Sequence, residues 1–598
     1  MKKNQTLKKW ATLFVCFIVS NHFAQTSAQN ENPYLLGKNT EFLKKLELQL
    51  DTNPKKENGN HQEIKLAVSN SELLDAKVNY QEKNSANSTH LEGEILGNHA
   101  GTFSIEIKNK KLEGRIILLK NRKAYTYYSD NDENAFIKEV DINSIICIDL
   151  PHLPTHLREK KSDNSGKYLI STAISKLQSL PGAAGCLLLD FDGHTVLAGS
   201  GWNGGNPIIA LPSGMSGINI YEAWEIVAED YRPFNINVTT DENVFNAYPQ
   251  NKRRRCVITP TDIASPGGTG IALINNFSSF SDLPCWVFTL GAGTSGDIVG
   301  EVASHELGHT FGLKHDGLGQ YAYYSGNGDW APIMGSNYYK NVTQWSKGEY
   351  TSATNHEDDL AIISGTTNAV GYRSDTQGNT FATAATLNIL GGQISALQNQ
   401  GVIEQAGDID MFKFTTSGGN TTLHVQAIEK HSDLLLKVSL YDEKNVLIAS
   451  YNGNPANLGL PITITANLTA GSYYLAITNS GYETADTGFT SYASLGAYNI
   501  SGSISSSNKV LSTIETIKND QIRIYPNPTR DELTIDFGSF KGVHQVEIIN
   551  AVQQILYKTT TSENILKISI ADKSPGIYFV IIKNKSTGYS KRFSIIKQ

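Results

Sequence analysis

The sequence has little cysteine, methionine or histidine, with 5, 4 and 14 residues of each among 598. So few cysteines exclude a small scaffold held together by dense disulfides. Neither sign of charge dominates: the net charge of −7 indicates neither nucleic acid nor an anionic membrane as a partner. Beyond the N-terminus no apolar run approaches the ~20 residues of a transmembrane helix. The composition is that of globular domains, and the length predicts roughly three to five of them.

A targeting segment is predicted over residues 1–28. Four lysines precede the apolar run WATLFVCFIV, and small residues follow it. This pattern is typical of a secretory signal peptide and is too short to span a membrane. Cys16 lacks a lipoprotein-type box before it, so a lipid anchor is not expected. Export would bring the rest of the chain into a setting that permits disulfides.

The stretch HELGHTFGLKH carries the strongest chemical signal in the chain. His305 and His309 are four residues apart, so on a helix they share one face and can bind one metal ion. Glu306 projects about 100° away and can reach a metal-bound water without being a ligand. Gly312 permits the left-handed conformation that ends a helix, which can return His315 to the same metal. One coordination position stays open, as in a catalytic zinc site.

The flanking sequence predicts that this stretch lies on a buried helix in an α/β domain. Ser295 can cap the helix, and Asp297 and Glu301 favour its first turns. The segment YEAWEIVAEDY has the apolar spacing of a second helix. Strands are predicted for apolar, β-rich runs before the active-site helix, namely CLLLDF (186–191), FNINVTT (234–240), GIALINNF (270–277) and CWVFTL (285–290).

The full motif, followed by Met334 in the turn APIMGSNYY, resembles the metzincin zinc endopeptidases. Asp316, directly after the third histidine, is similar to the reprolysin-like branch. The resemblance implies a metzincin-type α/β catalytic domain over residues 161–375, with one zinc ion held by the three histidines. It also implies that Met334 lies beneath them, that Glu306 is the general base for water activated by zinc, and that GIALINNF pairs with an extended substrate.

Some metzincins place a tyrosine two residues after the methionine, where this chain has Ser336. Tyr338 and Tyr339 follow, and we expect them to pack or lie at the surface rather than take part in catalysis. The loops 317–331 and 340–356 could line a wall of the substrate pocket or only cover it.

Four cysteines remain after signal removal, which allow three disulfide connectivities. We favour Cys256–Cys285 because both border predicted strands; Cys186 is the fourth. Cys147 precedes the catalytic domain and is a candidate latency thiol that would occupy the open zinc position. Its flanking residues do not match the usual switch motifs, so a buried or disulfide-bonded cysteine is the alternative.

Residues 29–160 are interpreted as a propeptide, with β-like alternation in GTFSIEIKN and LEGRIILLK. The basic stretch REKKS (158–162) could be a maturation site, although a linker would look the same. NKRRR (251–255) is interpreted as a solvated loop or a local clamp on substrate rather than a nucleic-acid patch.

Two β-sandwich domains are predicted after the catalytic domain. Residues 376–505 resemble the bacterial pre-peptidase C-terminal domain in DIDMFKF, LLLKVSLYD and LTAGSYYLAI. Calcium binding is left open there, and Asp408 and Asp410 are interpreted as loop or strand-edge residues. After a linker (506–520), residues 521–598 resemble the sorting domain of the type IX secretion system through YPNP and GIYF, which implies the secretion machinery as a partner.

The sequence therefore predicts a multidomain α/β plus all-β protein that is secreted and made as a zymogen. The expected activity is zinc-dependent hydrolysis of peptide bonds in extracellular proteins or peptides. The alternative is a surface adhesin or binding protein that uses the metzincin domain as a scaffold. The complete ligand set and the general base favour the enzyme.

Overall fold

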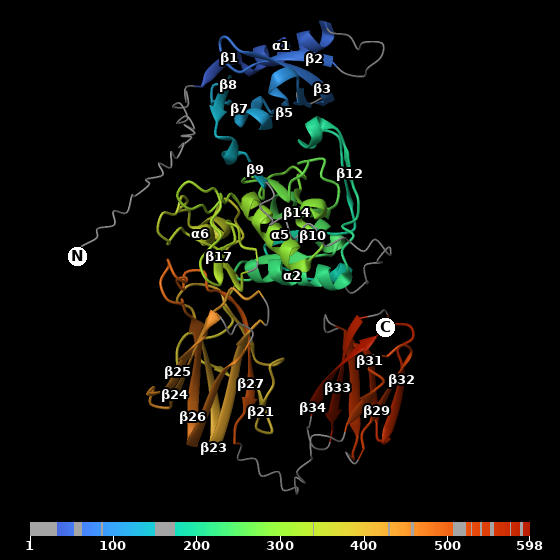
Figure 1. Cartoon of the computed structure of the whole chain (residues 1–598), viewed down its shortest axis with the longest axis vertical. Helices are drawn as coiled ribbons and strands as arrows, with labels where there is room; N and C mark the ends of the chain where they lie inside the picture. The colour runs from blue at the N-terminus through green and yellow to red at the C-terminus, as the bar shows by residue number, and fades with distance from the viewer. Residues whose placement is uncertain are drawn as a thin grey trace, which may run out of the picture.

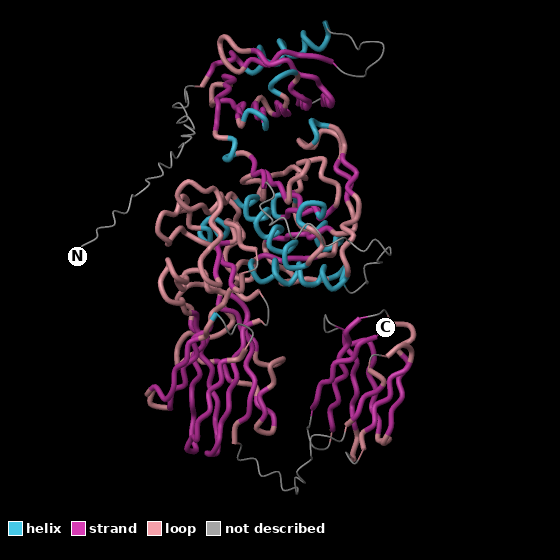
Figure 2. The backbone as a smooth tube through the Cα atoms, viewed as in Figure 1, coloured by secondary structure: helices cyan, strands magenta, loops and turns pink. Residues whose placement is uncertain are grey.

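The computed structural model describes residues 33–52, 62–84, 88–149, 174–338, 340–428, 431–455, 460–505, 522–527, 529–538, 541–550, 555–573, 576–585 and 590–597. The predicted signal peptide, the REKKS stretch and the linker lie outside these residues. The described chain is mostly β-sheet and forms several separate sheets, as Figures 1 and 2 show. The expectation of a strand-rich, multidomain chain is confirmed. No described helix is long and apolar enough to cross a membrane.

The N-terminal module is one antiparallel sheet with a helix on one face (Figure 1). Helix α1 (Asn39–Thr52) buries Phe42, Leu46 and Leu50, whose spacing of four residues places them on one stripe against the sheet. The strand order is β1-β8-β7-β6-β5-β4-β3-β2. The strands are β1 (Tyr34–Lys38), β2 (Gln62–Ala67), β3 (Leu73–Asn84), β4 (Ser88–Ile95), β5 (Gly101–Lys108), β6 (Lys111–Leu118), β7 (Lys123–Ser129) and β8 (Asn134–Val140).

The α/β unit is built on a six-stranded sheet of order β13-β10-β14-β16-β15-β9. Its first four strands are parallel, whereas β15 and β9 each run antiparallel to their neighbours. Each of the four predicted runs contains a strand, although GIALINNF is strand only to Leu273 and CWVFTL only to Phe288. The strands are β13 (Ile236–Thr239), β10 (Gly185–Asp190), β14 (Arg253–Thr259), β16 (Cys285–Phe288), β15 (Gly270–Leu273) and β9 (Ile146–Asp149). The helices are α2 (Gly217–Asp230), α3 (Glu242–Asn246), α4 (Thr289–Ala292), α5 (Gly296–Phe311) and α6 (Asp359–Ser364).

The two faces of this sheet are covered by different parts of the chain. Because side chains alternate along a strand, Ile258 and Val287 pack with α2 and α5 in one core, whereas Val257 and Trp286 face the other way. That second face is covered by the hairpin β11 (His194–Val196) and β12 (Ile208–Ala210), and by apolar side chains from the N-terminal segment such as Ile117 and Ile142. The N-terminal segment is therefore part of the core beside the sheet.

The β-sheet module (376–505) is a nine-stranded sheet whose long strands β23 and β26 pair along their length. Positive φ angles at Gly418 and Gly419 interrupt β23 near its middle. The module contacts the α/β unit directly, since Ala497 N donates to buried Glu229 at 2.8 Å. The strands are β19 (Ala385–Thr386), β20 (Ile389–Leu390), β21 (Gln393–Ile394), β22 (Gln400–Ile403), β23 (Ile409–Ala427), β24 (Leu436–Asp442), β25 (Leu447–Asn452), β26 (Ile462–Asn479) and β27 (Gly496–Ser503).

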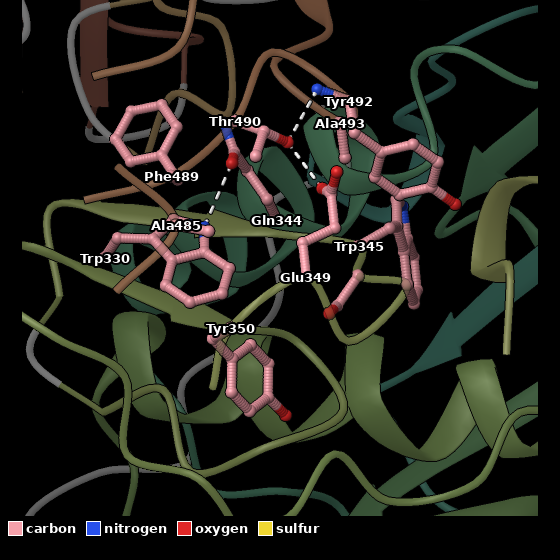
Figure 3. Close-up of a pocket in the computed structure, with 11 residues that line it drawn as sticks. Trp330, Gln344, Trp345, Glu349, Tyr350, Ala485, Phe489, Thr490, Tyr492 and Ala493 are labelled. Atoms are coloured by element: carbon pink, nitrogen blue, oxygen red, sulfur yellow. Dashed lines mark hydrogen bonds between the residues drawn. The ribbon is translucent and has the colours of Figure 1, made fainter. Parts of the chain in front are cut away.

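A pocket lies where the β-sheet module meets the α/β unit (Figure 3). Trp330 and Tyr350 line it from one side and Phe489 from the other, and Thr490 donates a hydrogen bond of 2.5 Å to Glu349 across the junction. None of the motif histidines lines this pocket. It belongs to the packing between the two parts.

The C-terminal module consists of two small antiparallel sheets that share one core. Leu533 and Ile535 of one sheet pack with Val546, Ile548 and Val580 of the other. The first sheet contains β28 (Arg523–Tyr525), β29 (Glu532–Asp536) and β32 (Ile565–Ser569), and the second contains β31 (Ile555–Thr561), β30 (His544–Asn550), β33 (Gly576–Asn584) and β34 (Ser590–Lys597).

The predicted disulfide Cys256–Cys285 is wrong. Both thiols are buried and form no disulfide, and the same holds for Cys147 and Cys186. Cys256 and Cys285 are direct partners on the parallel strands β14 and β16. In-register side chains on parallel strands project side by side, which does not supply the near-perpendicular dihedral of a disulfide.

The interpretation of NKRRR as a solvated loop is also wrong, because its arginines begin strand β14. Arg254 is fully buried and donates to the carbonyls of Phe277 at 2.9 Å and Ser281 at 2.8 Å. Arg255 pairs with Asp190. Backbone carbonyls and a carboxylate replace the water that these guanidinium groups lose on burial.

Candidate metal centre

Helix α5 carries the motif, and its two ends are formed by the expected residues. Ser295 occupies the N-cap position with φ −72° and ψ 136°, but its side chain makes no capping hydrogen bond. Asp297 accepts from Ile298 N at 2.8 Å instead and lies in the first turn. Gly312 ends the helix with φ 113°, the left-handed conformation that glycine adopts without strain. The chain then turns back, and His315 returns to the end of the helix.

The three histidines converge through the same ring atom. His309 Nε2 lies 3.0 Å from His305 Nε2 and 3.1 Å from His315 Nε2. The other nitrogens of the two helical rings face carbonyls: His305 Nδ1 donates to Ile333 O at 2.9 Å, and His309 Nδ1 donates to Leu313 O at 2.8 Å. Those bonds place the ring protons on Nδ1, so the Nε2 lone pairs point at one another.

This donor set fits zinc. Burial, and then the neighbouring His305, hold the pKa values of His309 and His315 well below that of an ordinary histidine. The rings are therefore neutral at physiological pH, which is the state that ligates metal. Neutral imidazoles with Nε2 atoms about 3 Å apart repel unless a cation lies among them, and zinc is bound by three such nitrogens in many catalytic sites.

Met334 packs against helix α5 beside Gly308, in the turn that the sequence indicates. It is fully buried, and Asp316 N donates to Met334 O at 2.8 Å, which ties the turn to the residue after His315. A Cβ built at Gly308 of α5 would lie 2.6 Å from Met334 Sδ. Glycine at this helical position therefore lets the methionine side chain approach the helix between the histidine turns.

Glu306 is fully buried and packs against strand β15. A Cβ built at Gly270 would lie 2.3 Å from Glu306 Oε1 and 2.8 Å from its Cδ. The absence of a side chain at Gly270 therefore makes the space that the carboxylate occupies. Sequence reasoning missed Gly270, although its place at the start of the predicted strand GIALINNF could have suggested a close approach.

Cys147 is brought to the three histidines by strand β9. Its Sγ lies 2.8 Å from His315 Nε2, and one ligand atom from each of the four residues lies within 4.8 Å of the others. Strand β9 pairs antiparallel with β15, with Cys147 opposite Ala272. Opposed residues in antiparallel strands project to the same face, which here is the face that α5 covers.

The tyrosine nearest the histidines was not among the sequence candidates. The ring centroid of Tyr323 lies 4.3 Å from that of His315, so the loop 317–331 reaches the site. Tyr338 packs partly buried against the main core, as expected, and Tyr339 lies outside the described residues.

Comparison with known proteins identifies only the end of the chain. Residues 523–597 match the family described as the secretion system C-terminal sorting domain. The C-terminal module is a type IX sorting domain. The protein is therefore secreted or displayed at the cell surface through type IX secretion, and the sorting domain interacts with that machinery.

A search of curated proteins finds no match to the chain. Among solved structures, the chain shares 20% identity with PorZ of the Porphyromonas gingivalis type-IX secretion system, over 17% of this chain and 14% of PorZ, with a TM-score of 0.12. It shares 9% identity with a Ruminococcus gnavus β-glucuronidase, over 32% of this chain and 35% of that one, with a TM-score of 0.15. The chain spans only about a third of that enzyme's length, and scores this low carry no argument.

Proposed function

We propose that the chain is a secreted zinc metalloendopeptidase of metzincin type. The observation that carries this proposal is the convergence of three imidazole Nε2 atoms beside a buried glutamate. Buried polar groups are normally hydrogen-bonded, and a purely structural role would leave these lone pairs facing one another. Three nitrogen ligands with an adjacent carboxylate instead match a hydrolytic zinc site.

Zinc at this site would supply Lewis-acid polarisation of the scissile carbonyl and would acidify the attacking water. Glu306 would accept the proton of that water and pass it to the leaving amine. Burial of Glu306 against Gly270 holds the carboxylate in one position. The edge of β15 offers backbone groups to an extended peptide, so the substrate would bind as an added strand.

The test is the substitution Glu306→Ala, with exposed Glu443→Ala as the matched control. After proteolytic removal of the N-terminal module, Glu306→Ala should keep one zinc per chain and lose casein cleavage by about 100-fold or more. Glu443→Ala should keep both. Cleavage by a zinc-loaded Glu306→Ala protein would place the general base elsewhere. An unsubstituted, processed, zinc-loaded protein that cleaves nothing in a broad peptide library would favour the alternative of a surface binding protein.

We propose further that the chain is made as a zymogen, with β9 as its inhibitory strand. The backbone of β9 occupies the edge of β15 from Ile146 to Asp149, where an extended substrate would pair. Cys147 on that strand lies among the three histidines, at the position that water and substrate would share. A thiolate is a strong zinc ligand, so one segment would block both the strand edge and the metal.

The substitution Cys147→Ser tests the role of the thiol, with buried Cys186→Ser on β10 as the matched control. The unprocessed Cys147→Ser protein should gain measurable cleavage but stay below the processed enzyme, because β9 still pairs with β15. Unprocessed Cys186→Ser should remain inactive. If Cys147→Ser is as inactive as the parent while its processed form is fully active, the thiol has no part in latency.

A further inference from the structure

A glycine-rich loop joins the strands β11 and β12 and reaches from the α/β unit to the N-terminal module (Figure 1). Its residues 199–205 have the sequence GSGWNGG and are called the glycine loop below. Gly201 N donates to Glu92 Oε2 at 2.6 Å, and Asn79 Nδ2 donates to Gly204 O at 2.8 Å. The α/β unit therefore holds the N-terminal module at residues that take no part in the metal site.

The surface that receives the glycine loop is a polar row across the N-terminal sheet. Tyr80, Glu92, Ser104 and Arg115 are direct partners in turn on β3, β4, β5 and β6, so their side chains project to one face. Leu91, one position along β4, faces the core that α1 covers on the other side. An antiparallel sheet commonly leaves its polar face to water, but Glu92 is only 2% exposed. The polar face is thus covered by a part of the chain that its own core does not require.

Four glycines of the loop are fitted to this face. All four have positive φ, and a Cβ built on each would lie 2.3–2.7 Å from an atom of the N-terminal module. A turn can require the positive φ, but it does not require that another module fill the space of the missing side chain. The glycines, each with the atom that its Cβ would meet, are Gly199 (Tyr80 Cε1), Gly201 (Arg115 Nη2), Gly204 (Glu94 Cγ) and Gly205 (Glu92 Cβ).

Apolar packing continues the contact beside the glycine loop. Trp202 is buried and packs edge to face against Trp286, with 6.1 Å between the ring centroids. The same core includes Ile117 and Ile142 of the N-terminal segment. Burial of these side chains adds hydrophobic stabilisation to the polar contact, and none of these residues is a ligand in the proposed zinc site.

We propose that the glycine loop is a docking site that keeps the N-terminal module bound after the chain between the two parts is cut. Its partner is residues 33–149 of this same chain, bound through the polar row. The inference extends the zymogen proposed above, but it concerns binding alone. Because β9 ends the bound segment, a docked module would leave β9 on the edge of β15. A cut in the linker would then not be enough for activation, and the module would also have to be degraded or displaced.

The test uses the full chain carrying Glu306→Ala, so that peptidase activity plays no part. The recognition sequence of a site-specific protease replaces REKKS (158–162), and the completely cut protein is passed over a size-exclusion column. We expect the N-terminal fragment to elute with the rest of the chain, both with zinc and after chelation by o-phenanthroline. A fragment that separates from the cut parent would overturn the proposal. Separation only after chelation would also overturn it, because retention would then depend on Cys147 at the metal.

A matched pair of glycine substitutions locates the docking site. The Cβ of Gly199→Ala would lie 2.3 Å from the Tyr80 ring, whereas that of Gly214→Ala meets nothing within 4 Å. The two glycines have φ angles of 77° and 75°, so the backbone strain is alike. From co-elution over a dilution series, Gly199→Ala should raise the dissociation constant of the cut fragment by about tenfold or more, and Gly214→Ala should leave it unchanged. Adding Tyr80→Ala to Gly199→Ala should recover part of the loss, because the opposing ring is removed.

Glu92→Ala tests the contact from the other side without changing the α/β unit. It removes the acceptor of Gly201 N and lies on the face away from the core of the module. It should raise the dissociation constant by about tenfold, because a buried donor loses a charged acceptor. Glu113→Ala, at an exposed position of the same sheet, should bind as the parent does. If Gly199→Ala and Glu92→Ala both retain the fragment as tightly as their controls, the docking site is refuted whatever the peptidase assays show.

Discussion

A single methyl group at Gly270 tests whether the position of the Glu306 carboxylate matters for catalysis. The added Cβ would lie 2.3 Å from Oε1, whereas an ordinary contact is at least 3.4 Å, so the carboxylate must move by about 1.1 Å. Glu306 is fully buried and cannot swing into solvent. A misplacement of about 1 Å at a catalytic group can cost on the order of 100-fold in rate.

We therefore expect Gly270→Ala to lower kcat/KM by about 100-fold, mostly through kcat, with zinc content unchanged. The measurement is hydrolysis of a quenched fluorescent peptide by the processed protein, beside zinc analysis. Gly471→Ala is the control, because a Cβ there meets only the Tyr473 ring at 3.9 Å. If Gly270→Ala keeps its rate to within about threefold at equal zinc content, the reasoning about Glu306 is refuted.

Two further predictions concern stability. Gly308→Ala should destabilise the chain by about 1 kcal/mol, since overpacking against Met334 costs about 1–3 kcal/mol and the gain in helix propensity is about 1 kcal/mol. In urea denaturation, the double variant Gly308→Ala with Met334→Ala should lose less stability than the sum of the two single losses, because truncation of Met334 relieves the overpacking. Strict additivity of the two losses would contradict the contact. Burial raises the pKa of Asp230 to about 7 and that of Asp433 well above its usual value. Protonation of these two carboxyls therefore stabilises the fold fully below about pH 4, and this stabilisation is lost as the pH rises through about 7. Asp433→Asn should therefore raise the thermal midpoint at pH 8 and change it little at pH 5, and an equal shift at both pH values would contradict the assignment.

The parts of the site that the sequence predicted depend on short-range geometry. The spacing of His305 and His309 requires one helical face, and a glycine at 312 permits the left-handed turn that returns His315. These relations extend over eleven residues and need no knowledge of the rest of the fold. The same holds for the four predicted strands and for helix α2.

The sequence did not predict the pairing of β9 with β15, the burial of Arg254 or the contact of Gly270 with Glu306, because these depend on contacts between distant segments. Cys147 and His315 are 168 positions apart, and nothing local in INSIICIDLP reveals that its strand pairs with β15. The burial of Arg254 depends on carbonyls of a loop more than 20 residues away, so a basic run looked solvated. The contact of Gly270 with Glu306 appears only when β15 and α5 are packed together.

In the latency that we propose, the pairing of β9 would explain how a single cysteine could act without a recognisable motif around it. Ile146 packs into the core on one face of the sheet, and Cys147 therefore points to the other face, toward the histidines. A slip of one residue would exchange these faces, burying the thiol in an apolar core and placing an isoleucine at the metal. The apolar contacts of Ile146 thus determine the register that delivers Sγ to His315. The placement of the thiol therefore depends on strand alternation and on a core shared with the α/β unit. If Cys147 maintains latency as we propose, replacing Ile146 with a charged residue should give the unprocessed protein measurable peptidase activity, as Cys147→Ser does.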